Sequence, residues 1–512
     1  MPRRKKTLLS LVFLFSLLVV TSCVSENGTS DQASSDPVVS EKEGSTIGMA
    51  TVRGKVLTDA GELVTAGIIV EDEEGNTHRV NTSLYSGYNL RLDPGTYKLH
   101  YVRGYEYSIV TKTITVEAYK TYYLQDVRLI QLEDSYAKGW VRGDLHQHSY
   151  HSDGLNSVHD VLISNISNDL YFSFLTDHNT GHGLPEWVQG NRVVANIDAH
   201  GQERLFNAYE GVEVTTEFGH YNALGLGLIF DLYEVTLRDV ERNKPQAEKD
   251  DIIRERIRYI GDTIRWMGAV AQINHPYSIS HMGFPYWDVI DSFDVVEIWN
   301  GYFLPSDGRY EPEQTSYQGQ NYRSKLHWFE TLNEIKNGGH YLAATAGTDN
   351  HDISGPYRHD PDFDETNIQD LADYDKLFLK YGKYTGSPST VVKIDGEITE
   401  EKVLESIRKG HSFLTNGPMI YADIAGKTYG ETLVTAADNA TANIELFARD
   451  GFEELRIIKN GEVIKTIETN DESRLKTAVE LTDIEADDWF IFEVFGQGVQ
   501  YAISNPIFIA AP

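Results

Sequence analysis

The chain has 512 residues, 40% of them hydrophobic, and a formal net charge of −32 at pH 7. The length predicts three or four domains, and the apolar fraction is sufficient for several cores. A chain this acidic is not expected to bind a nucleic-acid polymer, because phosphate backbones demand basic surfaces. Cys23 is the only cysteine, which excludes a disulfide within the chain.

Residues 1–22 have the pattern of a secretion signal. A basic start is followed by the apolar run Leu8–Val20, which is too short for a comfortable membrane span. The run leads into Val20-Thr21-Ser22-Cys23, which resembles a bacterial lipobox, where the cysteine is lipidated and becomes the first residue. The alternative for Cys23 is a spare or buried thiol. We therefore expect a signal peptide over 1–22, lipidation of Cys23, and an extracytoplasmic protein anchored to a membrane of the cell envelope.

Two segments without evident chemistry follow. Residues 23–48 are mostly polar and cannot bury enough apolar surface to fold, so they are expected to form a disordered tether. Residues 49–132 contain short strand-like runs with turns at Gly75-Asn76 and Asp93-Pro94-Gly95, which predicts a small β-sandwich. The stretch Leu92–Leu99 resembles the carboxypeptidase regulatory-like modules. A passive spacer is favoured for this segment over a glycan-binding module.

The stretch from Gly143 to Gly154 concentrates three histidines and two aspartates behind a short apolar-containing run. His146 and His148 are two residues apart, so an extended chain places both imidazoles on one face, where they can bind one metal ion. Asp153 follows a Ser-rich turn and can add an oxygen ligand. The alternative is a polar loop that happens to be rich in histidine.

The same form recurs along the chain: an apolar run that carries a residue of metal-ligand type, in most cases at its end. The later examples are Asp177-His178, Glu210 with Glu213, His220, Asn274-His275-Pro276 and Asp349-Asn350-His351. Such runs, separated by helical patterns, predict a parallel sheet covered by helices. In a (β/α) barrel the carboxyl ends of the strands converge on one face. The repetition therefore predicts a polynuclear metal site and weighs against the polar-loop alternative.

The remaining periodic patterns complete the predicted architecture. In the segment Asp250–Met267, isoleucines recur at helical spacing and form a stripe that belongs in the core. Glycines end two further helical patterns. Helices are predicted over residues 156–168, 250–267, 323–337 and 399–409, and a second β-sandwich over 417–512.

Taken together, the ligand-type motifs resemble the PHP (polymerase and histidinol phosphatase) superfamily, a group of metallohydrolases on a distorted (β/α)7 barrel. The resemblance covers residues 139–416 and includes all of the family's ligand positions. It implies a multidomain protein, α/β plus all-β, in which this barrel is flanked by an N-terminal and a C-terminal β-sandwich. The stretches Gly410–Pro418 and Ser504–Phe508 resemble more narrowly the CehA/McbA branch, whose namesakes cleave the carbamate ester carbaryl.

The resemblance implies nine metal-ligating residues, shared among two or three divalent transition ions, which would be zinc, manganese or iron. They are His146, His148, Glu213 and Asp349 on the first ion, Glu213 as a bridge with His220 and His275 on the second, and Asp153, His178 and His351 on the third. Glu213 and Asp349 are also expected to be catalytic, Asp349 by orienting or deprotonating the attacking water. His151 competes with Asp153 as a ligand, and Glu210 competes with Glu213.

The activity that the resemblance implies is a metal-dependent hydrolase that uses a hydroxide bridging two ions. The main hypothesis is a phosphoesterase acting on a small phosphate ester. The first alternative is a carboxylic or carbamate ester hydrolase, and the second is a non-catalytic binding lipoprotein, against which the complete ligand set argues. Arg192 and Arg358 lie near the ligand segments, and each is either a surface residue or a clamp for a substrate anion.

Overall fold

The computed structural model of the chain describes residues 48–198, 201–278, 283–301, 317–353 and 385–512. The predicted signal peptide and tether, Cys23 and Arg358 lie outside these residues, so they stay predictions. The described chain is a mixed α/β structure with a large content of β-sheet. Among its helices, none combines the length and the apolar character needed to cross a membrane.

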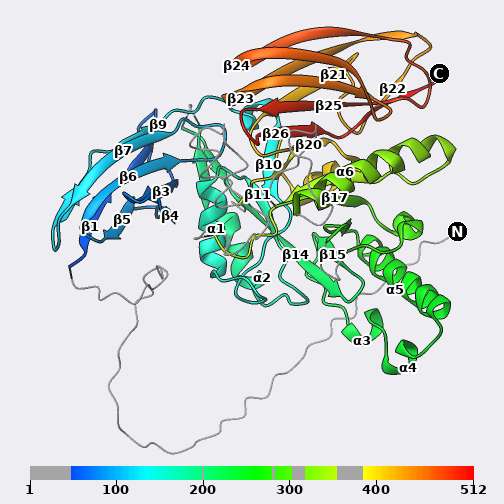
Figure 1. Ribbon diagram of the computed structural model, residues 1–512, viewed down its shortest axis with the longest axis horizontal. Coiled ribbons are helices and arrows are strands. Elements are labelled where there is room, and N and C mark those ends of the chain that lie inside the picture. The colour runs from blue at the N-terminus through cyan, green and yellow to red at the C-terminus, as the bar shows by residue number, and fades with distance from the viewer. Residues whose placement is uncertain (1–47, 199–200, 279–282, 302–316, 354–384) are drawn as a thin grey trace, which may run out of the picture. The chain divides into compact units, whose positions relative to one another are not determined.

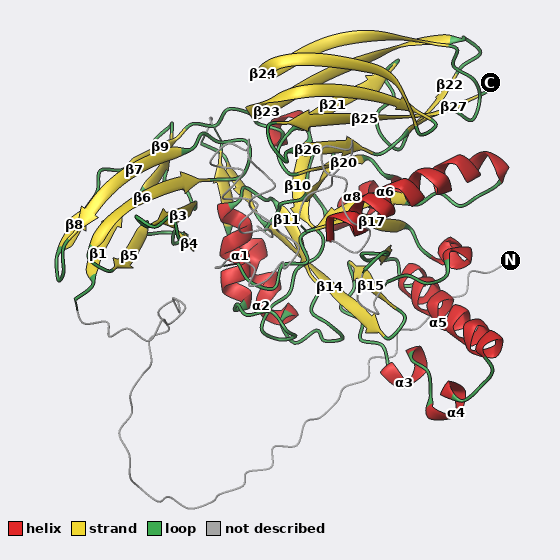
Figure 2. Cartoon of the chain, viewed as in Figure 1, coloured by secondary structure: helices red, strands yellow, loops and turns green. Residues whose placement is uncertain are grey.

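The first part of the described chain consists of nine short strands with a core of their own (Figure 2). The turn Asp93-Pro94-Gly95 joins two of them, and alternate residues of Tyr88–Leu92 are buried, as expected for a sheet with one face on a core. The strands are β1 (Ala50–Gly54), β2 (Val56–Thr58), β3 (Gly67–Glu71), β4 (Thr77–Asn81), β5 (Tyr88–Leu92), β6 (Gly95–Val102), β7 (Val110–Val116), β8 (Thr121–Tyr123) and β9 (Val127–Leu129). They pair in the orders β5-β1-β8, β4-β3-β6-β7 and β2-β9.

The central part alternates strands with helices. Its strands are β10 (Trp140–Asp144), β11 (Phe172–Leu175), β12 (Val194–Ile197), β13 (Glu203–Leu205), β14 (Asn207–Thr216), β15 (Gly219–Leu224), β16 (Val270–Ile273), β17 (Val295–Asn300), β18 (Ala343–Gly347), β19 (Ser389–Lys393) and β20 (Ser412–Thr415). Its helices are η1 (Tyr136–Lys138), α1 (Val158–Ser167), α2 (Leu184–Trp187), η2 (Val188–Arg192), α3 (Leu232–Val235), α4 (Asp239–Arg242), α5 (Gln246–Trp266), η3 (Trp287–Ser292), α6 (Tyr317–Glu334), η4 (Ile335–Asn337) and α8 (Glu400–Lys409). In α5 the predicted isoleucine stripe packs inward, since Ile253, Ile257, Ile260 and Ile264 are buried.

Seven of the central strands follow one another in the order β18-β17-β16-β15-β14-β11-β10. The two ends of this path meet just beyond the strands themselves. Asp349 donates its backbone N–H to the carbonyl of His146 at 2.8 Å, and His148 donates to the carbonyl of Asn350 at 3.0 Å. The loops after β10 and β18 are therefore bonded to each other, although these strands stand at opposite ends of the path.

The predicted parallel sheet is only partly parallel. Pairs β10–β11, β11–β14, β16–β17 and β17–β18 are parallel, but β15 runs antiparallel to both β14 and β16, and β19 runs antiparallel to β10. The physical reason at β15 is the length of its connection, because only Glu217 and Phe218 separate it from β14. A link of two residues makes a hairpin, whereas a parallel neighbour needs a crossover of a dozen residues or more.

The C-terminal strands continue the same sheet. They are β21 (Met419–Ile424), β22 (Thr432–Val434), β23 (Asn439–Lys459), β24 (Glu462–Thr482), β25 (Trp489–Gly496), β26 (Tyr501–Ser504) and β27 (Ile507–Ala510). Strand β26 pairs antiparallel with β20, so hydrogen bonding runs without a break from the central strands into this last part (Figure 1). Asn505 reinforces the junction, since its side chain bonds both the N–H and the carbonyl of Ala344 in β18 at 2.8 and 3.0 Å.

Arg103, which follows β6, connects the first strands to the central part. Its side chain is fully buried and donates to a carboxylate oxygen of Asp169 at 2.9 Å and to the carbonyls of Ile166 and Ala195 at 2.7 and 2.8 Å. A buried guanidinium is tolerated only when it is paired and hydrogen-bonded in this way. Arg103 therefore fixes the loop after β6 against the end of α1.

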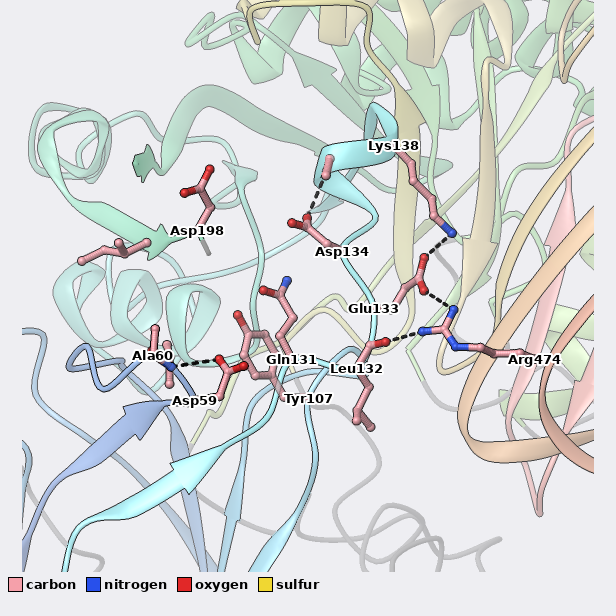
Figure 3. Close-up of a pocket in the computed structure, with 13 residues that line it drawn as sticks. Asp59, Ala60, Tyr107, Gln131, Leu132, Glu133, Asp134, Lys138, Asp198 and Arg474 are labelled. Atoms are coloured by element: carbon pink, nitrogen blue, oxygen red, sulfur yellow. Dashed lines mark hydrogen bonds and ion pairs between the residues drawn. The ribbon is translucent and has the colours of Figure 1, made fainter. Parts of the chain in front are cut away.

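A cavity of about 500 Å³ lies near this connection (Figure 3). It is lined by Thr58 and the two residues after it, by Tyr107, by residues of the segment Gln131–Lys138, and by Ile197, Asp198 and Arg474. Glu133 in its wall is 5% exposed and forms ion pairs with Lys138 at 2.5 Å and Arg474 at 2.7 Å. None of the nine candidate metal ligands lines this cavity. The negative charge of Glu133 is therefore balanced by two basic residues that line the same cavity. We assign the cavity no chemical role.

We predict that Arg103→Ala lowers the free energy of unfolding by about 3–5 kcal/mol, because it leaves Asp169 buried without its ion pair. Lys98→Ala is the matched control, since it removes the Lys98–Glu71 ion pair of β6 and β3, in which the lysine side chain is 56% exposed. A pair of that kind contributes about 0–1 kcal/mol. Chemical denaturation of both variants measures the difference, and equal losses would contradict the role given to Arg103.

Candidate metal centre

The nine candidate ligands come together at one end of the central strands. Every loop or strand that carries one belongs to the seven-strand path: His146, His148 and Asp153 follow β10, His178 follows β11, Glu213 lies in β14, His220 in β15, His275 follows β16, and Asp349 and His351 follow β18. Four overlapping groups of ligand atoms, each within 4.8 Å of one another, contain all nine residues between them. The convergence expected from the strand ends is present in the structure.

The first group surrounds one carboxylate oxygen of Glu213. Its Oε2 atom lies 3.3 Å from Nε2 of both His146 and His148, and Oδ1 of Asp349 lies 3.4 and 3.1 Å from the same two nitrogens. An ion with ligand distances of about 2.1 Å and ligand angles of about 90–110° would hold adjacent ligand atoms about 3.0–3.4 Å apart. The nitrogen–oxygen separations match this range, so His146 and His148 can bind a divalent ion together with Glu213, and Asp349 lies within ligand distance of the same two imidazoles.

The other carboxylate oxygen of Glu213, Oε1, faces a second pair of imidazoles. It lies 2.9 Å from Nδ1 of His220 and 3.4 Å from Nε2 of His275. His178 also approaches this carboxylate, with its Nδ1 atom 2.9 Å from Oε2. Since Glu213 presents one oxygen to each set, its position is that of a bridging ligand.

The third group lies closest to solvent. Oδ1 of Asp153, whose side chain is 59% exposed, is 3.1 Å from Nε2 of His351 and 3.5 Å from Nε2 of His178. The ring of His148 stacks on those of His351 and His178 at 4.2 and 4.4 Å between centroids. This group therefore shares His148 and His178 with the two inner sets rather than standing apart from them.

Several ligand atoms in these groups are buried without any hydrogen bond. Three of them face the first group: Nε2 of His146, Nε2 of His148 and Oε2 of Glu213. The other two are Nε2 of His220 and Nδ1 of His275, the ring nitrogens of these residues that do not approach Glu213. Buried polar atoms are nearly always hydrogen-bonded, so five such atoms in one place require an explanation. Divalent ions explain them, because each of these atoms is a good ligand for a transition metal.

The electrostatics of the cluster are dominated by Glu213. Burial alone would raise the pKa of Glu213, but the imidazoles of His178, His146 and His220 hold its pKa well below the usual range. Conversely, burial would lower the pKa of His146, and the carboxylates of Glu297, Glu213 and Asp349 raise it well above the usual value. For His178, burial would lower the pKa, but the nearby carboxylates, chiefly that of Glu213, raise it to about 9. Protons and metal ions thus compete for one negatively charged cage.

A buried carboxylate outside the predicted set orients two of the candidate ligands. Glu297 in β17 lies with Oε1 3.0 Å from Nδ1 of His146, and its Oε2 accepts from the backbone N–H of His275 at 3.0 Å. A carboxylate behind a ligating imidazole fixes its tautomer and orientation. Glu297 was not among the residues predicted from the sequence, although a single acidic residue inside the apolar run Val295–Trp299 is a signal that could have indicated it.

Asp177 and Asn274 have supporting roles of the same kind. Asp177 accepts from the backbone N–H and the hydroxyl of Ser149, both at 2.7 Å, and from the hydroxyl of Ser152 at 2.8 Å, which holds the loop between His148 and Asp153. Asn274 donates to Oε1 of Glu213 at 2.8 Å. The Asp-His and Asn-His-Pro motifs therefore each combine a supporting residue with the candidate ligand that follows it.

The backbone at the site is constrained as well. His275 and Asp349 have φ values of 27° and 49°, in the left-handed region that residues other than glycine rarely adopt. Close packing adds to this at Gly347, where a Cβ atom would lie 2.6 Å from Cβ of His146 and 2.8 Å from Oε1 of Glu297. Strained backbone of this kind clusters at functional sites.

The two competing assignments are separated by the structure. Glu210 is exposed on β14, whereas Glu213 is completely buried within the cluster. His151 stacks on Tyr150 at 4.3 Å between ring centroids and is absent from the four ligand groups among the described residues. Arg192 is exposed at the end of η2.

Comparisons with other proteins give little. A scan against protein-family models finds no match, and a search of curated proteins finds none either. Among solved structures, a two-domain protein from Bacteroides vulgatus that contains a predicted PHP-like metal-dependent phosphoesterase is 16% identical, over 71% of this chain and 95% of that one, with a TM-score of 0.33. A putative metal-dependent phosphoesterase from Bifidobacterium adolescentis is 14% identical over 46% of this chain and 94% of that one, with a TM-score of 0.25. An amidohydrolase from Chromobacterium violaceum is 16% identical over 41% and 87%, with a TM-score of 0.24. TM-scores this low carry no argument, so the functional proposal rests on the site itself.

We predict that metal binding releases protons and strengthens as the pH rises. With a pKa of about 9, His178 is protonated at pH 7 in the metal-free protein, and its proton must leave before the nitrogen can bind an ion. The apparent affinity should therefore increase from pH 7 to pH 9 and level off above it. In the metal-free protein the stabilisation from protonated His178 is complete below about pH 6.5, its ordinary pKa, and is lost as the pH rises through about 9.

Calorimetric titration with Mn²⁺ or Zn²⁺, in buffers of different ionisation enthalpy at pH 7 and pH 9, measures the released protons directly. Fewer protons should be released at the higher pH. An affinity and a proton count that are the same at both pH values would contradict this account of the cage.

Proposed function

We propose that the chain is a metal-dependent hydrolase of the PHP type that acts on a small phosphate ester. The observation that carries the proposal is that one oxygen of Glu213 and one of Asp349 each lie 3.1–3.4 Å from the Nε2 atoms of His146 and His148, with Glu213 extended to a second set of ligands. A carboxylate that can bridge two ions is the arrangement of two-metal hydrolytic sites, which clamp both oxygens of a displacement at phosphorus.

The chain's own residues have distinct tasks in this proposal. Bound ions would lower the pKa of water and polarise the scissile ester. Glu213 sets the spacing of the cage, and Glu297 holds His146 and the backbone of His275 in place behind it. Asp349 is 16% exposed at its side chain, so it can face both the cage and an incoming molecule, which suits a residue that orients the attacking water. The Asp153 group is the most open and would meet the substrate first.

The choice of a phosphate ester over a carboxylic or carbamate ester rests on the two-metal arrangement and not on the Ser504–Phe508 motif. The Ser504–Phe508 motif suggested the CehA/McbA branch, but its Asn505 is completely buried and bonds to Ala344 in β18 and to Ser412, neither of which is a candidate ligand. This part of the resemblance thus has a packing role and does not point to a substrate. A purely binding protein would not require a cage of nine ligand residues at one place.

The same proposal extends to the architecture. The seven-strand path, joined at its ligand end, supports a distorted (β/α)7 barrel over residues 139–416, with β-sandwiches over 49–132 and 417–512 as its flanking domains. Strand β26, which pairs with β20, would make the C-terminal sandwich an extension of the barrel sheet.

We further propose that Cys23 carries a lipid that anchors the protein on the outer side of a membrane in the cell envelope, on the strength of the lipobox-like motif. Cys23→Ala should abolish the anchoring, because the thiol is the attachment point. Fractionation of cells and mass spectrometry of the N-terminal peptide measure it. The anchor proposal is wrong if wild-type protein carries no lipid at Cys23 and the variant still partitions with membranes.

We predict that Glu213→Gln lowers turnover by about 10³-fold or more, since each 1.36 kcal/mol of barrier corresponds to a factor of ten. The amide retains volume and one oxygen but cannot bridge two cations as an anion, so positioning and charge stabilisation are both lost. Glu210→Gln is the matched control on the same strand, because its side chain is exposed. It should change turnover less than about 3-fold, well under 1 kcal/mol of barrier.

A panel of phosphate, carboxylate and carbamate esters, assayed with Mn²⁺ or Zn²⁺, identifies the substrate class on which this comparison is made. The metal content of each variant is measured alongside, and Glu213→Gln should hold fewer ions than Glu210→Gln. Hydrolysis confined to carboxylic or carbamate esters would overturn the phosphoesterase proposal. Near wild-type turnover in Glu213→Gln would overturn the bridging role.

A further inference from the structure

Helix α6 begins at the ligand end of the sheet. Asn321, near its start, accepts from the backbone N–H of Asn300 at 3.0 Å and donates to the carbonyl of Gly301 at 3.3 Å, where β17 ends. The side chain of Asn300 donates in turn to Glu297 at 3.0 Å, the carboxylate that also contacts His146 and His275. A chain of hydrogen bonds from Asn321 through Asn300 to Glu297 thus connects the first turns of α6 to the metal cage.

Arg323, two residues after Asn321, has an unusual environment for this protein. Its guanidinium carbon lies 4.9 Å from the ring centroid of Tyr277, and Tyr277 follows the candidate ligand His275 by two residues. Its Nε atom is buried and makes no hydrogen bond, and no ion pair between described residues includes Arg323. The chain has 77 acidic and 45 basic residues, so a half-buried arginine without an acidic partner is unexpected.

Two other basic residues of the central part have the kind of acidic partner that Arg323 lacks among the described residues. Lys325, on another face of α6, is buried and pairs with Glu493 at 3.0 Å. Arg254 of α5 lies over the ring of Tyr286 at 4.3 Å, much as Arg323 lies over Tyr277, but its Nε atom also pairs with Asp288 at 2.8 Å. Arg254 therefore has a carboxylate partner beside its ring, as most stacked arginines of the described chain do. Arg142, over the ring of Tyr105 at 4.6 Å, is an exception, and Arg323 likewise forms no ion pair among the residues that the structure describes.

Further hydrogen-bonding groups line the same face of α6. Gln320, one turn before Arg323, is 5% exposed, and its Nε2 atom makes no hydrogen bond. His327, one turn after Arg323, stacks on Trp287 at 3.9 Å between ring centroids, and its Nδ1 atom bonds the hydroxyl of Tyr277. Residues at spacings of three and four lie on one face of a helix. The face toward the His275 loop therefore combines a guanidinium and an amide donor, neither of which has a full set of partners.

We propose that Arg323 and Gln320 form a subsite for an oxyanion that the substrate carries in addition to the ester group that is cleaved, either a carboxylate or a second phosphate. The subsite rests on the proposed function, since it names the substrate class of that same site as phosphate esters with a second anionic group. A planar guanidinium whose face is held by an aromatic ring presents its N–H edge to such a group and binds it bidentately. The ordering of Arg323 by Tyr277 reduces the entropy that binding would otherwise cost.

The binding test uses the full-length, metal-loaded protein and titration calorimetry with sodium sulfate and with sodium benzoate at constant ionic strength. Wild-type protein should bind at least one of the two at a site that depends on Arg323, and Arg323→Met should weaken that event at least 10-fold. Arg323→Lys, which keeps the charge but not the fork, should give an intermediate affinity. Arg254→Met is the matched control, because it removes a stacked arginine that already has an acidic partner, and it should bind as wild type does.

The two anions distinguish the sources, since sulfate reports a phosphate-like subsite and benzoate reports a carboxylate subsite. The subsite is refuted if neither anion binds, or if both bind equally well to wild type and Arg323→Met. If Arg323→Met fails to fold, as judged by its circular dichroism, the Arg323→Lys variant decides, and an unchanged affinity there refutes the bidentate contact.

A kinetic test separates this inference from the proposed function. Phenyl phosphate is compared with 3-carboxyphenyl phosphate, 4-carboxyphenyl phosphate and 1,3-phenylene bisphosphate. Wild type should prefer at least one compound with a second anionic group through a lower KM, and Arg323→Met should remove the preference while leaving phenyl phosphate within about 3-fold, under 1 kcal/mol. Failure to hydrolyse any phosphate ester overturns the proposed function, and the calorimetry still decides the subsite. Hydrolysis without a preference, or a preference that survives in Arg323→Met, overturns the subsite alone.

Discussion

A carboxylate with no exposure to solvent is the constraint on which the centre of this molecule depends. Glu213 is completely buried, and an isolated charge there would cost far more than the marginal stability of a domain. It is tolerated because imidazoles approach both of its oxygens and the amide of Asn274 donates to one of them. The β14–β15 hairpin supplies both Glu213 and His220, so this one connection builds the middle of the cage.

The cage is built in two layers with separate functions. The inner layer offers atoms that fit metal ions, and several of those atoms make no hydrogen bond to protein. The outer layer consists of acids that are hydrogen-bonded to protein, among them Glu297 and Asp177. Because the outer acids are hydrogen-bonded to backbone N–H groups, to hydroxyls and, for Glu297, to the amide of Asn300 and the ring of His146, they fix where the inner atoms point without competing with them for an ion.

The sequence indicated the candidate site more directly than the fold around it. The motifs that carry the nine candidate ligands lie in or next to apolar runs, and a strand end is a local feature that a single segment reveals, while the ligand set itself came from the resemblance to the PHP superfamily. The direction of a strand is not a local feature. The apolar run Tyr221–Leu224 predicts a strand but not its direction, and it is the short hairpin link from β14 that makes β15 antiparallel. Glu297 escaped notice because it lies inside a run instead of at its end. Arg323 could not be recognised from sequence at all, since its lack of a partner depends on which residues the tertiary structure brings near it.

The bonding of the loop after β10 to the loop after β18 has a consequence for how the protein is made. A nascent chain that has emerged as far as residue 300 already contains seven of the nine candidate ligands, but lacks Asp349 and His351. Until β18 arrives, the partners of His146 and His148 on that side are missing, and a contact across about 200 residues forms slowly. Metal acquisition should therefore be a late event in biosynthesis that follows synthesis of β18, and partly made chains should compete poorly for ions with the finished protein.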